Sequence, residues 1–374
     1  MNPIEQSLSQ FGADKMFRHL DRLADWQNGR WPFPVTVELD LTNACNHHCP
    51  DCSFSYLRSQ SKESIPGPLA MSLLAQLSDC GVKAITFSGG GEPLVYGVDR
   101  VLRLMRLCRD LGMDAALITN GQRLTSDEFL SLCSWVRVSL DAYDEATFAR
   151  SHGGSPDQFH EVIANLRRMC AAALWRKRDS LPCATVGVGF LTNERSVYES
   201  DFYEAARFAA TIDGLDYLQF RPAITNGVAD PTCCGGMRKP LPKPTVDRMF
   251  DAYQEASERW ARDDFRVLLS ADKYDAMWRP EFGRTYSNCH GSFLQATIGA
   301  DCRLYICCHG QGRNEFCLGD LKDQRFSEAW HSDRARNVRR SINPQRHCTP
   351  CCRLHPQNVV LEKIRQPTTH EAFI

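Results

Sequence analysis

The sequence has no excess of either charge and no long hydrophobic run. Its net charge is -1 at pH 7, whereas a dedicated nucleic-acid-binding protein usually shows a basic excess. No apolar stretch reaches transmembrane length, and residues 1–20 lack the continuous apolar core of a secretory signal peptide. These absences argue against nucleic-acid and membrane partners, and they favour a cytoplasmic protein.

Cysteine, in contrast, is abundant, with 18 residues in a chain of 374. Without a secretory signal we do not expect disulfide bonds, because cytosolic thiols are kept reduced. Eight of the 18 cysteines fall between Cys289 and Cys352, and three more stand close together at Cys45, Cys49 and Cys52. Thiols grouped in this way are typical of metal sites.

The three early cysteines directly follow an apolar-polar run at residues 35–42. Their spacing, C-x3-C-x2-C, places three thiols in a loop that leaves a predicted strand. Three thiolates leave one iron of a four-iron cluster without a protein ligand, much as a catalytic zinc site keeps one open position. A structural zinc site is the alternative, with His47, His48 or Asp51 as its fourth ligand.

From residue 35 to 224 the sequence alternates short strand patterns with helical patterns. Strands are predicted at residues 35–42, 84–88, 115–119, 136–140, 185–191 and 216–221. Helices are predicted between them at residues 69–80, 98–111, 126–135, 159–174 and 198–210. Six β-α units in sequence indicate an α/β fold with a parallel sheet, and the site of such a fold lies at the carboxyl ends of the strands.

Two segments outside this alternation carry helical patterns. Residues 1–34 are predicted to contain a short amphipathic helix, whose apolar positions are Phe17, Leu20, Leu23 and Trp26. Residues 225–288 are interpreted as a linker loop and a bridging helix from Thr245 to Trp260. The loop contains Cys233 and Cys234, to which the sequence assigns no role.

Residues 289–352 are interpreted as a small cysteine-rich α+β domain, followed by a tail at 353–374. A hairpin is predicted at 293–298 and 302–306. Around and after it, four thiols have the spacing of one closed metal site: Cys289, Cys307, Cys348 and Cys351. A zinc ribbon and an iron-sulfur cluster both fit this segment. Four other cysteines remain unassigned, namely Cys302, Cys308, Cys317 and Cys352.

Polar groups follow the predicted strands at their carboxyl ends. After the second strand comes Ser88-Gly89-Gly90-Gly91-Glu92-Pro93, in which glycine permits close approach of a ligand and Glu92 offers a carboxylate to an ammonium group. The third and fourth strands are followed by Asn120, Ser139 and Asp141, which are also common in turns and helix caps.

Charged side chains also share faces of two predicted strands. Gln219 and Arg221 lie on one face of the sixth strand, where Arg221 can bind a carboxylate or phosphate or form a salt bridge inside the barrel. Glu38 and Asp40 share a face of the first strand and leave the same two interpretations open.

The cysteine spacing together with the glycine-rich motif resembles the signature of the radical S-adenosylmethionine (radical SAM) superfamily. The resemblance implies a partial (β/α)6 TIM-like barrel over residues 35–224. It implies that a [4Fe-4S] cluster, whose open iron binds SAM, is held by the catalytic residues Cys45, Cys49 and Cys52. It also implies SAM contacts at Gly90, Gly91, Glu92, Pro93, Asn120, Ser139 and Asp141. One departure is Asp51, since the residue before the third cysteine is usually aromatic.

The C-terminal segment resembles the twitch subdomain, a shorter form of the SPASM domain, found in the dehydrogenase of aminocyclitol biosynthesis. This resemblance implies one auxiliary [4Fe-4S] cluster, with the ligands Cys289, Cys307, Cys348 and Cys351. We therefore expect net oxidation or epimerisation of a small molecule such as a sugar or aminocyclitol, with flavodoxin or ferredoxin as electron donor. The alternatives are a maturase that crosslinks or oxidises a ribosomal peptide and, more remotely, a zinc-stabilised binding protein without enzymatic activity.

Overall fold

The computed structural model describes residues 12–192, 199–223, 243–278, 284–348, 352–367 and 369. Within these residues, ten strands form one sheet in the order β10-β9-β8-β1-β2-β3-β4-β5-β6-β7. The first seven are β1 (Thr36–Asp40), β2 (Ala84–Ser88), β3 (Asp114–Thr119), β4 (Trp135–Ser139), β5 (Thr185–Thr192), β6 (Tyr217–Pro222) and β7 (Arg266–Leu269). They are parallel to one another, so their carboxyl ends meet at one edge of the sheet.

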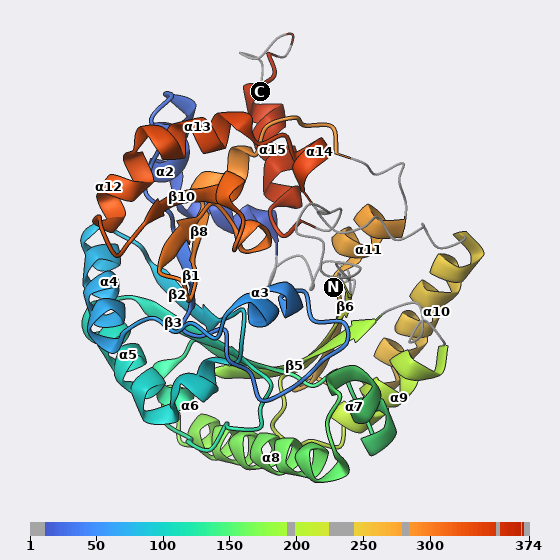
Figure 1. The fold of residues 1–374 in the computed structure, drawn as a ribbon. Coiled ribbons are helices and arrows are strands. Elements are labelled where there is room, and N and C mark those ends of the chain that lie inside the picture. Colours follow the sequence, from blue (N-terminus) through green and yellow to red (C-terminus); the bar gives the residue numbers. More distant parts are fainter. Residues whose placement is uncertain are drawn as a thin grey trace.

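Helices connect these strands and surround the curved sheet (Figure 1). They are α3 (Ser55–Gln60), α4 (Gly67–Asp79), α5 (Val98–Asp110), α6 (Phe129–Leu132), α7 (Glu145–His152), α8 (Pro156–Arg178), α9 (Glu199–Ala209) and α10 (Lys243–Trp260), with the short 3-10 helix η2 (Pro93–Tyr96). The predicted α/β class is confirmed, and the arrangement is a partial TIM-like barrel. No helix in the described part of the chain is long and apolar enough to cross a membrane.

The alternation of side chains along each strand separates a packed face from an inner face. In β4, Val136 and Val138 are completely buried beneath the outer helices, while Arg137 and Ser139 face the interior. All six predicted barrel strands are present, with bounds that differ by at most two residues. The predicted helix at 126–135 is reduced to α6, which has four residues.

The interpretation of residues 225–288 as a linker and a bridging helix is incomplete. The bridging helix is α10, but β7 follows it and pairs in parallel with β6, which adds a strand to the barrel. The four residues of β7 are too few for a periodic signal in the sequence. The helix α11 (Ala271–Trp278) comes next. Cys233 and Cys234 lie outside the described residues.

The predicted C-terminal hairpin is confirmed as β8 (Gln295–Ile298) and β9 (Arg303–Tyr305). β8 pairs in parallel with β1, so the hairpin and β10 (Cys317–Asp320) extend the barrel sheet instead of forming a sheet of their own. The remaining elements are η4 (His290–Phe293), η5 (Cys308–Gly310), η6 (Asn314–Phe316), α12 (Phe326–His331), α13 (Asp333–Ser341), α14 (Pro344–His347) and α15 (His355–Arg365).

Both ends of the described chain meet beside η4. Residues 353–374 were expected to form a tail, but the structure has the helix α15 within them. Leu361 of this helix packs with Phe293, Met16 and Trp26. The N-terminal segment forms two helices, η1 (Ala13–Arg18) and α2 (Leu20–Gln27), rather than one. The break between them shifts the helical phase, so the predicted apolar positions Phe17 and Leu20 are 46% and 67% exposed.

Candidate active site

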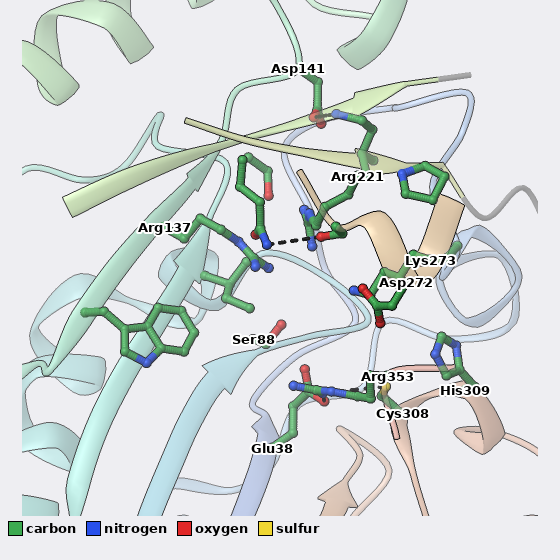
Figure 2. Close-up of a pocket in the computed structure, with 18 of the residues that line it drawn as sticks. Glu38, Ser88, Arg137, Asp141, Arg221, Asp272, Lys273, Cys308, His309 and Arg353 are labelled. Carbon is green, nitrogen blue, oxygen red and sulfur yellow. Dashed lines mark hydrogen bonds and ion pairs between the residues drawn. The ribbon is translucent and has the colours of Figure 1, made fainter. Parts of the chain in front are cut away.

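A cavity of about 1400 Å³ lies inside the barrel and reaches the carboxyl ends of the parallel strands. Its wall includes all three cysteines of the early loop, inward side chains of β4 and β6, and residues of the C-terminal region such as Cys308 and Arg353. Figure 2 shows part of this wall. The cavity therefore includes the predicted location of the site at the strand ends, and that location stays a prediction.

The three early cysteines lie close enough together for neighbouring thiols to affect the pKa values of Cys45 and Cys49. Burial raises the pKa of the Cys45 thiol, and burial with the neighbouring Cys52 and Cys45 thiols raises the pKa of Cys49 well above its usual range. The His47 backbone N–H donates a hydrogen bond to Cys45 Sγ over 3.4 Å. Three thiolates in such a place require a positively charged centre, so the donor set fits an iron-sulfur cluster.

Two histidines lie beside Cys49. His152 Nδ1 is 3.3 Å from Cys49 Sγ and 3.3 Å from His47 Nδ1, so these three side chains could together hold a metal ion. His47 was one of the ligands proposed for the zinc alternative. His152 comes from α7, which the sequence did not predict, and its Nε2 lies 2.8 Å from the Leu140 carbonyl oxygen. The convergence of Cys45 and Cys52 on the cavity favours the cluster over this zinc site.

The glycine-rich motif lies against the cysteine loop. The Gly91 N–H donates to the Thr42 carbonyl over 3.0 Å, and the Glu92 N–H donates to the Ala44 carbonyl over 2.9 Å. A Cβ atom on Gly91 would collide with the Ala44 carbonyl oxygen, so only glycine permits this approach. The predicted pairing of the two motifs is thus a direct backbone contact.

Glu92 is buried at the cavity and receives three hydrogen bonds. Its carboxylate accepts from the Thr119 hydroxyl at 2.6 Å, the Asn120 N–H at 2.7 Å and the Leu94 N–H at 3.0 Å. Burial raises the pKa of Glu92, and these hydrogen bonds oppose the rise. A carboxylate has about four acceptor positions, so one remains for the predicted contact with a SAM ammonium group.

Asn120 connects the third strand to the cysteine loop. Its Nδ2 donates to Asn46 Oδ1 over 2.9 Å, and Asn46 Nδ2 donates to Gln122 Oε1 over 2.7 Å. Gln122 Oε1 also lies 2.9 Å from His47 Nε2. Asn120 therefore has a positioning role in the structure, and its contact with SAM stays a prediction.

Ser139 and Asp141 line the cavity at the end of β4. Asp141 adopts a left-handed φ of 47°, and its carboxylate accepts a hydrogen bond of 2.6 Å from the Leu191 N–H. Burial raises the pKa of Asp141 to about 6, against the lowering effect of that hydrogen bond and of Arg221 and Arg137. Both residues line the cavity, and their contacts with SAM remain predictions.

The late cysteines form a second group. The thiol of Cys307 lies among those of Cys308, Cys348, Cys352 and Cys289, which together with burial raise its pKa well above its ordinary value. The pKa of the Cys289 thiol is raised first by burial and second by the Cys352 thiol. Cys351, the predicted fourth ligand, lies outside the described residues. Cys352 is thus a further candidate ligand that sequence spacing did not select.

Arg353 and Cys308 line the cavity beside this second group of cysteines. The sequence assigned a role to neither of them. Arg353 forms an ion pair of 2.6 Å with Glu38 and donates to Cys308 Sγ over 3.7 Å. Glu38 therefore has a structural salt bridge, one of its two proposed roles. Asp40 is buried, and burial and Glu38 raise its pKa well above its ordinary value. Cys308 follows Cys307 in the chain and lines the cavity.

Comparison with known families assigns two regions of the chain. Residues 39–197 match the radical SAM superfamily, and residues 289–365 match SPASM, an iron-sulfur cluster-binding domain. The chain therefore contains a radical SAM domain at residues 39–197 and a C-terminal SPASM domain at residues 289–365. Its cofactors are SAM and [4Fe-4S] clusters, which confirms the predicted cofactors.

Individual relatives differ in their chemistry. The S-adenosylmethionine-dependent nucleotide dehydratase of Lacinutrix mariniflava is 31% identical over 118 residues, which are 29% of this chain and 24% of the dehydratase. The chain thus spans about a quarter of that relative. The PqqA peptide cyclase of Rhizobium meliloti is 23% identical over 309 residues, which are 82% of this chain and 76% of the cyclase.

Two solved structures share the fold. Streptococcus suis SuiB bound to S-adenosylmethionine superposes with a TM-score of 0.61 at 15% identity, covering 86% of this chain and 73% of SuiB. Native anSMEcpe with bound AdoMet superposes with a TM-score of 0.57 at 15% identity, covering 87% of this chain and 91% of the other. At such identities the likeness supports the fold alone.

Proposed function

We propose that this chain oxidises a substrate held in the cavity between its two cysteine groups. The observation that carries the proposal is that the same cavity is lined by Cys45, Cys49 and Cys52 and by Cys308, the neighbour of Cys307. When bound, SAM and the first cluster supply a 5'-deoxyadenosyl radical that removes a hydrogen atom from the substrate. Loss of one further electron toward an auxiliary cluster at the second cysteine group, with release of a proton from the substrate to solvent, would complete a net two-electron oxidation.

Each part of the chain has a defined task in this proposal. Cys45, Cys49 and Cys52 hold the first cluster, and the glycine-rich motif, fixed against their loop, presents Glu92 to the SAM amine. Cys289, Cys307, Cys348 and either Cys351 or Cys352 hold an auxiliary cluster. With four thiolate ligands that cluster has no open position for substrate, so electron transfer is its role.

The substrate class has two candidates. A small molecule such as a sugar or aminocyclitol fits a cavity of about 1400 Å³ shared with SAM. A peptide is the second candidate, and the PqqA peptide cyclase favours it because its alignment covers 82% of this chain. SuiB has also been solved bound to its precursor peptide.

The test is SAM cleavage by anaerobically reconstituted protein with dithionite. We expect 5'-deoxyadenosine from the native chain and none from the C45A variant. C348A is the second arm, in which SAM cleavage continues while formation of oxidised product stops. If the native chain produces no more 5'-deoxyadenosine than C45A does, the proposal is rejected. If C348A forms as much oxidised product as the native chain, the role of the auxiliary cluster is rejected.

A further inference from the structure

Two arginine side chains converge inside the barrel. Arg137 on β4 and Arg221 on β6 both line the cavity, and Figure 2 shows both projecting into it. Between their strands lies β5, where Gly189 has no side chain. A Cβ atom on Gly189 would be 3.0 Å from Arg221 Nη2 and 3.7 Å from Arg137 Cδ. The two arginines therefore cover the same glycine, and the missing side chain gives them room.

Within the described residues, neither guanidinium group has an ion-pair or hydrogen-bond partner. Among the described residues, no side-chain hydrogen bond or ion pair involves Arg137 or Arg221, and the Nε atoms of both are buried without an acceptor. Burial, and then the charge of Arg221, lower the pKa of Arg137 to about 9, and burial likewise lowers that of Arg221. Both remain charged at neutral pH, so two positive charges lie close together on the wall of the cavity.

Nearby carboxylates do not neutralise this pair. Glu38 is bound to Arg353, and Asp141 accepts its hydrogen bond from the Leu191 N–H and forms no ion pair with either arginine among the described contacts. Asp141 does act on Arg221 electrostatically at longer range. Two like charges held close together without a partner disfavour folding, so a residue pair of this kind is explained when a ligand supplies the opposite charge.

We propose that Arg137 and Arg221 bind an oxyanionic group of the substrate, either a phosphate or a carboxylate. The proposal rests on the function proposed above and adds the chemical class of the substrate. Guanidinium groups present paired N–H donors that match the oxygens of both anions. Two positive charges match the dianion of a phosphate monoester most closely, so phosphate is expected to bind more tightly than carboxylate.

The pair adjoins two of the predicted SAM contacts, because Ser139 is paired with Gly189 in the sheet and the Asp141 N–H donates to the Gly189 carbonyl over 3.2 Å. The other predicted SAM contacts come from the loops after β2 and β3, whereas the arginines converge over β5. The bound oxyanion would thus hold the substrate on the β5 side of the cavity, with its reacting carbon facing the cysteine loop.

Binding of simple anions to the reconstituted protein, saturated with SAM, tests this inference. The probes are inorganic phosphate and glutarate, titrated calorimetrically at low ionic strength. R137Q and R221Q are each expected to weaken binding of the preferred anion by ~10-fold or more, as for loss of a charge-assisted hydrogen bond. R137K, which keeps the charge, is expected to retain part of the affinity. The matched control is R207Q, because Arg207 is 55% exposed on α9 and pairs with Glu204.

Each outcome decides the inference. The inference is supported if R207Q binds the anion as tightly as the native protein does while R137Q and R221Q bind it more weakly. The anion that binds more tightly then identifies the group as a phosphate or a carboxylate. If the native protein binds neither anion, or if R137Q binds as well as R207Q, the inference is wrong. It is also wrong if SAM affinity falls by the same factor, because the pair would then bind the SAM carboxylate. Cleavage of SAM by the native protein is measured separately, so failure of the proposed function is distinguishable.

Discussion

Two pairs of polar side chains on the cavity wall differ in how they are hydrogen bonded. On the cysteine side, formed by the loops after β1, β2 and β3, Glu92 and Asn120 are hydrogen bonded to neighbouring protein groups. On the arginine side, formed by the inner faces of β4, β5 and β6, the Nε atoms of Arg137 and Arg221 are buried without an acceptor in the part of the chain that the structure describes. Satisfied groups fix the shape of a site, whereas unsatisfied charges identify where a ligand completes it.

The largest effect is expected at the most completely bonded residue. Replacing Glu92 by glutamine puts an amide nitrogen against N–H and O–H donors and removes the charge that strengthens their hydrogen bonds. The free energy of unfolding should fall by about 3 kcal/mol, and SAM binding should be lost with it. Denaturant unfolding and SAM titration measure the two effects. A variant as stable as the native protein would show that Glu92 does not hold the cysteine side together.

A smaller loss is expected from Thr119→Val, which keeps the side-chain shape but removes a hydroxyl that donates to Glu92 and accepts from the Gly121 N–H over 3.1 Å. Its hydroxyl donates to Glu92 over 2.6 Å, so the variant should lose about 2 kcal/mol of stability. Ser139→Ala is the matched control, since Ser139 is a hydroxyl residue on the cavity wall to which no described hydrogen bond is assigned. Chemical denaturation of the two variants measures the loss of unfolding free energy in each. Equal losses would contradict the proposed difference between the cysteine side and the arginine side.

The arginine side should respond in the opposite direction. Arg137→Gln removes a desolvated charge that repels Arg221, so the free energy of unfolding should rise by about 2 kcal/mol. The gain accompanies weaker binding of the anion, as expected where a functional site is kept at a cost in stability. Thermal unfolding with no added anion is the measurement. A less stable R137Q would mean that Arg137 supports the fold through contacts within the protein.

This difference also explains which parts of the site the sequence predicted. The cysteine side depends on short motifs, so Cys45, Glu92 and Asn120 are recognisable from spacing and from their place after predicted strands. The arginine side depends on three-dimensional convergence. Arg137 is visible as a charged residue in the apolar strand Trp135–Ser139, but its meeting with Arg221 over Gly189 requires the register of β4, β5 and β6.

The fold divides in the same way. Periodic patterns located the six barrel strands, because each strand is a local run of buried side chains. The pairing of β8 with β1 joins segments more than 250 residues apart, and no local pattern encodes it. The fourth auxiliary ligand is a similar case. Cys351 and Cys352 are adjacent in sequence, so their spacing alone does not choose between them. Cys352 becomes a candidate because its thiol contributes to the raised pKa values of Cys289 and Cys307.

The smallest predicted effect concerns Asp141, which lies between the two sides. Its pKa is raised by burial from 3.8 to about 6, so the folded state binds a proton more tightly than the unfolded state does. Stability from this group is therefore present at low pH and is lost as pH rises from about 4 through 6. Between pH 5 and pH 7 the loss is about 1 kcal/mol. Asp141→Asn should remove this slope, so the difference in unfolding free energy between the native protein and the variant should change with pH in that interval. A difference that is constant from pH 5 to pH 7 would place the Asp141 pKa near its ordinary value, and would mean that the Leu191 N–H and the two arginines already outweigh the effect of burial.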